Sequence, residues 1–506
     1  MTKAGALCLA TLIGTAGALS AQTSAETEDA PLSAIDWMSS VPIALPDADP
    51  ALAFEEPVVT TGAVPTVEAA PLSDGGGTGV GILSPAISGF PSTLWQGATA
   101  TDISERLDAL PAEAIAPIRE LRQRLLLSAA APPRGTSEAE FLVTRLNELR
   151  ALGAVPMALS LVEEAGAGSL RDPGVFAVYA DIALLTGTED AACARLRGEA
   201  ALSNDLALKV FCLARGRDWN AAALALNTGE ILGDLSLEMG ELLAQFLEPE
   251  LADPDNPPLP TGPVTPLTAR LREAIGAPLA TAELPRAFAA LDLRPDLGWK
   301  AQLDAAERLV RTGSYPVGTL RLLYNAGVPA ASGGVWDRAQ AMQALDASLT
   351  SGEPVVVADA LTRAHGEMVD AGLEAELAAM VAEEVEQFDF ADEAATGIRD
   401  RLVLLSASYE SVAATASPML QAVAFGDTSS VAPETPLELA VAAGFSPSAQ
   451  ASAPVSLGLE VLDAMVTLER ARGGDASGVP AALATLRSVG LESTARRAAL
   501  HLLLGA

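Results

Sequence analysis

Apolar residues recur at three- and four-residue spacing in long stretches of this chain, which is the pattern of amphipathic helices. Most of these stretches are bounded by glycine or by a capping residue: Ser332-Gly333-Gly334 marks a start, and Gly313 and Gly352 mark stops. No stretch alternates apolar and polar residues beside a hairpin dipeptide. The pattern therefore predicts an all-α fold. The clearest helical stretches are FLVTRLNELRALG (141–153), LGWKAQLDAAERLVRTG (297–313), VWDRAQAMQALDASLTSG (335–352) and LEAELAAMVAEEVEQF (373–388).

A glycine followed five residues later by alanine recurs along this helical pattern. The glycines are Gly153, Gly187 and Gly216, at spacings of 34 and 29 residues, and a fourth copy begins at Gly490. Glycine permits the left-handed turn that ends one helix, and alanine lets the next helix pack closely. Over residues 137–248 the pattern resembles the tetratricopeptide repeat, although the aromatic and proline positions of that family are mostly missing. The resemblance implies an α-solenoid-like array of helical hairpins. Any helical hairpin of an alanine-rich chain also produces such a pattern.

The composition agrees with helices and restricts the partners. Hydrophobic residues make up 50% of the 506 residues but aromatic residues only 4%, so alanine supplies much of the apolar content. Alanine is the strongest helix former, whereas strands need β-branched and aromatic residues. The formal net charge of −34 repels phosphate backbones and excludes nucleic acid as a partner. The chain is also similar to secreted alanine-rich helical proteins of Gram-negative bacteria, a resemblance that supplies no function.

The first residues predict export. Residues 1–21 have the form of a secretory signal peptide, with Lys3, an apolar run from Ala4 to Leu19, and then small residues. We expect a periplasmic protein with no stable membrane insertion after cleavage; an uncleaved anchor is the alternative. Residues 22–96 hold ten carboxylates and no basic residue among scattered proline, glycine and serine, which predicts a disordered acidic tail.

Proline divides the helical part of the chain. The segment PELADPDNPPLPTGPVTP cannot continue a helix, and a softer break ends in SPSAQASAPVS. The predicted organisation is therefore a tetratricopeptide-like domain (97–248), a Pro-rich linker (249–266), a second helical domain (267–426), a flexible linker (427–455) and C-terminal helices (456–506).

Two cysteines remain after export, Cys193 and Cys212, and they bracket a predicted helix–turn–helix. The turn centres between Leu202 and Ser203, with Ser203 or Asn204 expected as the helix cap. Each cysteine then lies about 14 Å along its own helix, at equal height. Because an exported protein meets an oxidising compartment, we predict a structural disulfide worth about 3 kcal/mol. Two free buried thiols are the alternative.

No pattern of catalytic, cofactor-binding or metal-binding residues stands out. The glycine-rich stretch GGGTGVG (75–81) lacks the lysine of a phosphate-binding loop. The only histidines, His365 and His501, have no ligand-spaced neighbours, and we expect both on helix surfaces. Tyr409-Glu410-Ser411 is similar to the Glu-Ser motif of helical lytic transglycosylases, in which the glutamate is a general acid, but the spacing to the following glutamine is too short. Acidic residues between Glu383 and Glu393 are expected to form a solvated face.

Tryptophans suggest where a partner docks. Trp37 and Trp95 fall within the predicted tail, where an exposed indole is either a docking motif or packs back onto the helical domain. Trp219, Trp299 and Trp336 stand at helix starts and are expected in the core.

The sequence as a whole predicts an exported, non-catalytic helical scaffold or adaptor that binds an envelope protein and carries no cofactor. The alternative is a peptidoglycan-acting envelope enzyme that uses Glu410.

Overall fold

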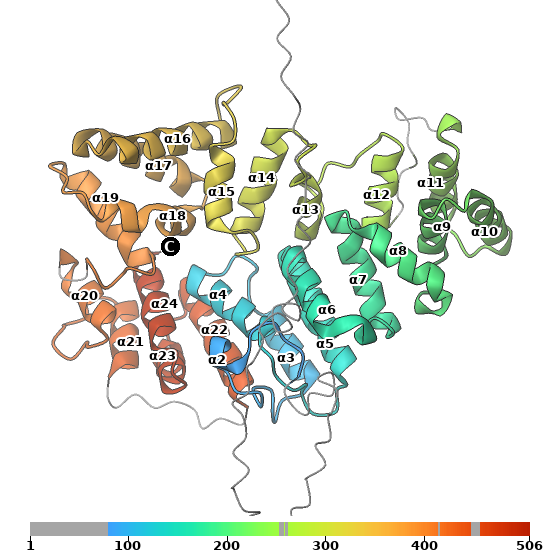
Figure 1. The fold of residues 1–506 in the computed structure, drawn as a ribbon. Coiled ribbons are helices and arrows are strands. Elements are labelled where there is room, and N and C mark those ends of the chain that lie inside the picture. The colour runs from blue at the N-terminus through green and yellow to red at the C-terminus, as the bar shows by residue number, and fades with distance from the viewer. Residues whose placement is uncertain (1–78, 252–257, 259–261, 413–414, 447–455, 506) are drawn as a thin grey trace, which may run out of the picture. The chain divides into compact units, whose positions relative to one another are not determined.

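The computed structural model describes residues 79–251, 258, 262–412, 415–446 and 456–505. Contacts divide the chain into residues 1–71 and 72–506, and every described residue belongs to the second unit. The regular elements among the described residues are helices (Figure 1), and their one β contact is an isolated bridge between Leu83 and Ser128. The predicted all-α class is confirmed. The expected signal peptide, Trp37 and the tail up to residue 78 lie outside the described residues.

The first helices are α2 (Pro85–Ser88), α3 (Ala100–Asp108), α4 (Ala116–Leu127), α5 (Glu138–Leu152), α6 (Val155–Ser169) and α7 (Pro173–Thr186). Next come α8 (Glu189–Gly198), η1 (Ala200–Leu202), α9 (Leu206–Arg215), α10 (Trp219–Leu232), α11 (Leu237–Leu247), η2 (Pro249–Leu251) and α12 (Pro266–Ala274). The middle of the chain forms η3 (Arg286–Phe288), α13 (Ala289–Asp292), α14 (Trp299–Val310), α15 (Val317–Tyr324), α16 (Val335–Ser351), α17 (Pro354–Asp370), α18 (Glu374–Val385) and α19 (Glu393–Leu405). The last helices are α20 (Pro418–Phe425), α21 (Pro436–Phe445), α22 (Leu457–Arg472), α23 (Val479–Ser488) and α24 (Glu492–Leu504).

Glycines of the repeat pattern end helices as expected, with one exception. Gly153 and Gly187 terminate α5 and α7 in the left-handed conformation, at φ 82° and 76°, and Gly490 has φ 83°. Gly216 instead has φ −79°, and its neighbour Arg217 takes the left-handed conformation at φ 65°. The third copy of the pattern therefore makes its turn one residue later.

From α5 to α11 each helix packs against the next one in sequence (Figure 1). Loops of a few residues join them, so neighbours in sequence become neighbours in space. The second half of this stretch has its own buried cluster, which includes Phe176, Leu196, Phe211 and Leu243. Helices two apart also touch, since α5 packs on α7 and α9 on α11, and α7 packs on α12 as well.

The two ends of the described chain share one hydrophobic core, which corrects the expectation of separate C-terminal helices. Helix α3 packs on α22, and α4 packs on α24. The Gly458 amide donates to the Leu94 carbonyl at 2.9 Å, and Arg497 of α24 forms an ion pair with Glu120 of α4 at 2.5 Å. Residues 456–505 thus complete the core that begins at Phe90.

Two segments expected as tail or linker contain packed structure. In the first, the Val80 amide donates to Glu138 and the Leu83 amide to the Leu127 carbonyl, both at 2.9 Å. In the second, α21 begins at a capping box formed by Thr435 and Glu438 and packs against α23. Packed structure therefore begins before residue 96, the end expected for the tail. The segment 427–455, expected as a flexible linker, contains helix α21. Residues 447–455 and half of the Pro-rich linker, 252–257 and 259–261, lie outside the described residues.

Candidate functional site

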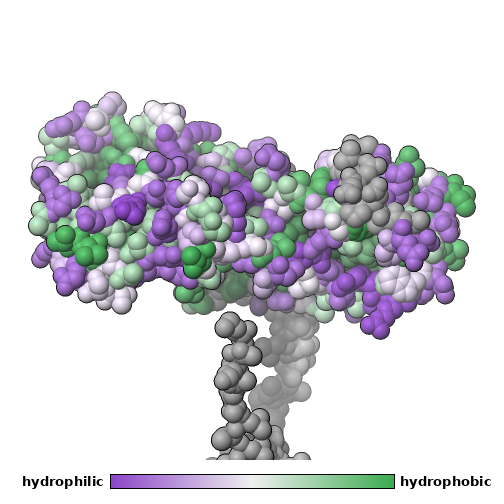
Figure 2. Space-filling view, turned by 90° about the horizontal axis from the view of Figure 1, so that it is seen from above, coloured by the Kyte–Doolittle hydropathy of each residue, from purple (hydrophilic) through white to green (hydrophobic). Residues whose placement is uncertain are grey.

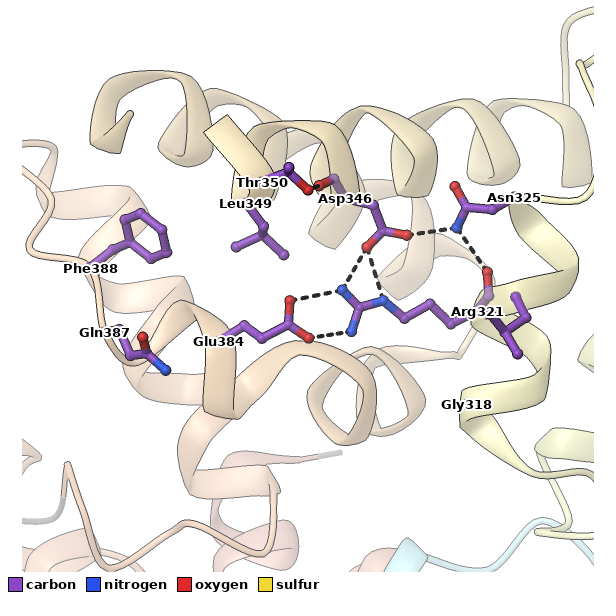
Figure 3. A pocket seen from close by; sticks show the side chains of 10 residues that line it. Gly318, Arg321, Asn325, Asp346, Leu349, Thr350, Glu384, Gln387 and Phe388 are labelled. Carbon is purple, nitrogen blue, oxygen red and sulfur yellow. Dashed lines mark hydrogen bonds and ion pairs between the residues drawn. The ribbon is translucent and has the colours of Figure 1, made fainter. Parts of the chain in front are cut away.

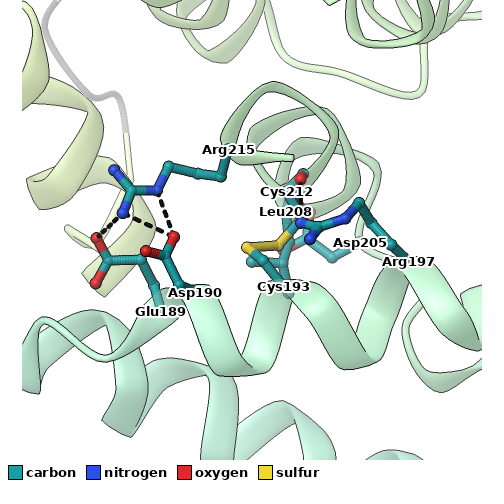
Figure 4. The surroundings of a disulfide bond; sticks show 8 residues. All are labelled: Glu189, Asp190, Cys193, Arg197, Asp205, Leu208, Cys212 and Arg215. Carbon is teal, nitrogen blue, oxygen red and sulfur yellow. Dashed lines mark hydrogen bonds and ion pairs between the residues drawn. A yellow bond between two sulfur atoms is a disulfide. The ribbon is translucent and has the colours of Figure 1, made fainter. Parts of the chain in front are cut away.

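The two cysteines predicted to pair do meet, between α8 and α9 (Figure 4). Their sulfurs are 1.99 Å apart, and both side chains are buried. The Nη1 of Arg197 donates to the Cys212 carbonyl at 2.9 Å, which ties the end of α8 to α9. The cap of α9 is Asp205, whose carboxylate accepts the Leu208 amide at 3.1 Å, and not Ser203 or Asn204. The bridge lies within a hydrophobic cluster, so its place in the fold is structural.

The structure decides between the two alternatives for Trp95 and corrects the position expected for Trp219. Trp95 is only 2% exposed and packs edge-on against Phe141 with ring centroids 5.8 Å apart. Of the two alternatives, packing against its own helical domain therefore describes Trp95, and the docking motif does not. Trp219, expected in the core, is 50% exposed at the start of α10. Trp299 and Trp336 are partly buried and pack against each other, with ring centroids 5.1 Å apart.

Helix α10 exposes large apolar residues among polar ones on the face that no described helix covers: Leu224 and Ile231 lie beside Asn220, Asn227 and Thr228. It packs against α9 and α11 through the stripe Ala222, Leu226 and Gly229. Leu224 and Ile231, seven residues apart on the other face, are 68% and 85% exposed. Figure 1 places α9 to α11 at the right of the fold, and Figure 2 shows hydrophobic residues among hydrophilic ones on that side. The exposed large apolar residues here, which we call the α10 face, are Trp219, Leu224, Ile231, Leu232 and Leu237.

A groove lies beside this array, between α5, α7, α9 and α12, with a volume of about 690 Å³. Its floor includes the buried side chains of Leu185 and Phe288. Arg150 and Asp181 form an ion pair in it, and burial raises the pKa of Asp181 while Arg150 opposes that rise. Because the two charges neutralise each other, the groove is mainly an apolar concavity.

A second pocket of about 540 Å³ is built around Arg321 of α15 (Figure 3). Asp346 of α16 and Glu384 of α18 both bind its guanidinium, at 2.7 and 2.9 Å, and the Met380 carbonyl accepts a further bond at 2.8 Å. Donation of hydrogen bonds to the Glu384 carboxylate raises the pKa of Arg321. All five guanidinium donors are engaged within the protein, which leaves none for a ligand. The cluster therefore ties three helices together.

The histidines differ from each other, and the expected surface position is wrong for His501. Its side chain is fully buried on α24, where Nε2 lies 3.1 Å from the Leu405 carbonyl. Burial, assisted by the nearby charge of Arg497, lowers its pKa to about 3. His365 lies 2.8 Å from the carboxylate of Glu374. Burial tends to raise the pKa of Glu374, but hydrogen bonds from Arg401 and His365 lower it to about 2.

Glu410, the residue of the enzymatic alternative, is 60% exposed and accepts a hydrogen bond from Arg496 at 3.1 Å. In the acidic segment after α18, Asp392 caps α19 and Asp389 lies 3.8 Å from Arg399. Among the described residues no group of His, Cys, Asp and Glu side chains is arranged to hold a metal ion.

Comparison with protein-family models, with curated proteins and with solved structures finds no match to this chain. None of the described helices combines the length and apolar character needed to cross a membrane.

The α10 face was missed in the sequence, although its signal was present. Residues 219–232 read WNAAALALNTGEIL and contain a single charge, Glu230. A helix that is apolar on all sides belongs in an interior. The expectation that Trp219 lies in the core did not take into account that this helix is the outer member of its hairpin. Neither the burial of His501 nor the ion pairs of Arg321 could be predicted from neighbouring residues. Their partners, Leu405 and Glu384, are distant in the sequence.

Proposed function

We propose that this protein is an exported, non-catalytic helical-repeat scaffold or adaptor of the cell envelope, and that it binds a protein partner through the α10 face. The observation that supports the proposal is the exposure of Leu224 and Ile231 on one face of α10, with further exposed apolar side chains at its two ends and at the start of α11. Clustered exposed apolar residues are characteristic of interaction surfaces.

The chemistry of the partner follows from the charges around this face. Asp218, Glu230 and Asp234 are exposed near it, and the whole chain carries a net charge of −34. A second copy of the chain would bring two strongly acidic molecules together. A partner helix with an apolar face and flanking lysine or arginine residues fits both the apolar side chains and the acidic rim.

Export is supported by the residues at the start of the chain and by the cysteine pair. Lys3 and the apolar run after it have the form of a signal peptide, and a buried cystine persists best in an oxidising compartment. The periplasm of a Gram-negative cell meets both conditions.

The experiment compares two double variants after crosslinking in the periplasm of the host. Leu224→Glu/Ile231→Glu places two carboxylates on the α10 face, where a partner would have to bury them. We expect the recovery of the crosslinked partner, quantified by mass spectrometry, to fall at least about tenfold. Both substituted side chains are exposed, so stability should change by no more than about 0.5 kcal/mol per site.

Leu322→Glu/Val328→Glu is the matched control, because these side chains are 73% and 86% exposed but lie on and after α15. It should retain the partner. Equal recovery from both double variants would refute the docking role of the α10 face. Lysis of cell-wall substrate by the native protein and not by Glu410→Gln would instead establish the enzymatic alternative.

A further inference from the structure

The turn between α9 and α10 contains a strained residue. In the part of the chain that the structure describes, Arg217 is the only residue other than glycine with a positive φ, at 65°. Its amide donates to the Ala214 carbonyl at 2.8 Å, and the Asp218 amide donates to the Leu213 carbonyl at 3.0 Å. These two bonds form a Schellman turn that ends α9, with Arg217 as its left-handed residue.

At other turns of this kind the chain has glycine in the left-handed position. The bond from the residue after the left-handed one to the carbonyl five residues earlier recurs among the described residues. Glycine adopts this conformation without a clash, whereas any side chain beyond it adds strain. The left-handed residues of these other turns are Gly153, Gly187, Gly233, Gly276, Gly313, Gly372, Gly426, Gly474 and Gly490.

The glycine directly before Arg217 serves a different contact. A β-carbon at Gly216 would lie 2.6 Å from Nε of Arg197, and Nη1 of this arginine donates to the Cys212 carbonyl (Figure 4). This close approach explains why position 216 is glycine. It does not explain an arginine at position 217, since a second glycine there would remove the strain.

The side chain of Arg217 makes no contact that offsets this strain within the described structure. It is exposed, and no described residue forms a hydrogen bond or an ion pair with its guanidinium. Arg215, two residues earlier, instead binds Asp190 at 2.7 Å (Figure 4). Residues in strained backbone conformations concentrate at binding sites, where the side chain that the strain positions is used. Position 217 therefore calls for a contact outside the described chain.

The surroundings of Arg217 indicate what that contact is. It lies two residues before Trp219, at the start of the α10 face. The carboxylate of Asp218 caps α10 and forms no ion pair with Arg217. At the other end of α10, Glu230 and Asp234 are exposed and form no ion pair with a described residue. The face therefore has an unpaired cation at one end and unpaired carboxylates at the other.

From the strain at Arg217, its unpaired guanidinium and its place beside Trp219, we infer that Arg217 binds a carboxylate of the protein partner. A guanidinium and a carboxylate can form two parallel hydrogen bonds, which fix orientation as well as adding affinity. The partner then presents an acidic residue to Arg217 and basic residues to Glu230 and Asp234, so it docks in one direction only. This inference rests on the proposed function, because it names the chemistry at one end of the same face.

Carbodiimide crosslinking tests the chemistry of this contact. The reagent activates a carboxylate, and a lysine amine that touches it displaces the activated group to form an amide. Arg217→Lys supplies the amine in a chain that, without residues 1–21, otherwise has only Lys209 and Lys300. Mass spectrometry of treated periplasm from the host should find an amide between position 217 and an aspartate or glutamate of the protein that is crosslinked through the α10 face.

Arg134→Lys is the matched control, because Arg134 is exposed between α4 and α5 and has no ion pair with a described residue. It should give no amide with that protein. An equal yield from the two variants, or no amide at position 217, would overturn the inference.

Arg217→Gly separates binding from stability. Relief of the strain should raise the thermal midpoint by about 1–2 °C, while recovery of the crosslinked partner should fall about tenfold. Arg217→Asn, which also tolerates the left-handed conformation, should lose the partner to the same extent. Arg134→Asn removes the same charge elsewhere and should keep recovery within about twofold. A residue that only shapes the turn would leave recovery unchanged in all three variants.

The two proposals fail in distinguishable ways. If Arg217→Gly retains the partner while Leu224→Glu/Ile231→Glu loses it, the carboxylate contact is refuted and the docking role of the α10 face stands. If both retain the partner, both proposals are refuted.

Discussion

At the scale of single residues, burial decides how His501 responds to acid. The imidazole is enclosed on α24 beside Leu405, and its charged form would lose the hydration that an unfolded chain provides. Its pKa is therefore lowered from 6.5 to about 3 in the folded protein. Between these values the unfolded chain binds more protons than the folded one, so stability must fall as the pH falls.

This difference predicts a pH-dependent stability that is lost in a single variant. Between pH 6.5 and 4.5 the His501 contribution to the free energy of unfolding should decrease by about 1.4 kcal/mol per pH unit. Glu374, whose pKa is lowered from 4.5 to about 2, contributes stability that is lost only below this window. Urea unfolding of the native protein and of His501→Phe across the window measures the difference in slope. Parallel curves would show that the imidazole does not remain neutral in the fold.

The different burial of Trp95 and Trp219 predicts different effects of replacing each of them. Trp95 fills the core shared by the two ends of the described chain, so Trp95→Ala should lower the free energy of unfolding by about 3–5 kcal/mol. Trp219 stands on an exposed face, and Trp219→Ala should change it by no more than about 0.5 kcal/mol. Chemical denaturation measures both. Similar effects of the two substitutions on the free energy of unfolding would contradict a buried Trp95 and an exposed Trp219.

At the scale of an element, close packing opposes helix propensity at Gly458 of α22. A β-carbon there would lie 2.4 Å from Cε3 of Trp95, whereas at Gly366 of α17 nothing lies within 4 Å. Alanine is favoured over glycine in a helix by about 1 kcal/mol, so Gly366→Ala should stabilise the protein by about that amount. Gly458→Ala should destabilise it by about 1–3 kcal/mol because the ring must move. If the two variants shift the thermal midpoint in the same direction, α22 does not approach Trp95 as described.

The hairpin of α8 and α9 depends on its cysteine pair. The bridge joins residues 19 positions apart, and closing a loop of this length stabilises a fold by about 3 kcal/mol. Cys193→Ala/Cys212→Ala should therefore lower the free energy of unfolding by about that amount. Thiol titration in denaturant should find no free thiol in the chain without residues 1–21, and two after reduction. Two free thiols before reduction would show that Cys193 and Cys212 are buried thiols without a disulfide between them.

At the scale of the whole molecule, the contacts that organise the described unit join residues far apart in sequence. Leu94 meets Gly458, and Glu120 meets Arg497. Local signals could be read correctly: glycine ends α5 and α7, and the cysteines face each other across one turn. No local signal could reveal that the C-terminal helices complete the core of the first ones. For the same reason the linker boundaries were misplaced, because proline, glycine and serine near α21 suggested a break where tertiary packing supports a helix.

The same reasoning explains how much of the candidate site was accessible from the sequence. An interaction surface on a helical array was expected, with Trp37 and Trp95 as possible docking residues, but Trp95 is buried and Trp219, expected in the core, is exposed. Exposure of a helix depends on what lies beside it, and α10 has described helices on one side only. Its sequence shows that it is apolar; only the fold shows which side is left open.

The docking role of the α10 face is the central claim, and site-specific photocrosslinking in living host cells tests it most directly. A benzophenone amino acid is placed in turn at Leu224 and Ile231, and at Leu322 and Val328 as exposed controls. The account predicts that positions 224 and 231 both yield one adduct with the same partner protein, and that the control positions do not. Adducts of equal yield from all four positions, or none from the α10 face, would contradict it.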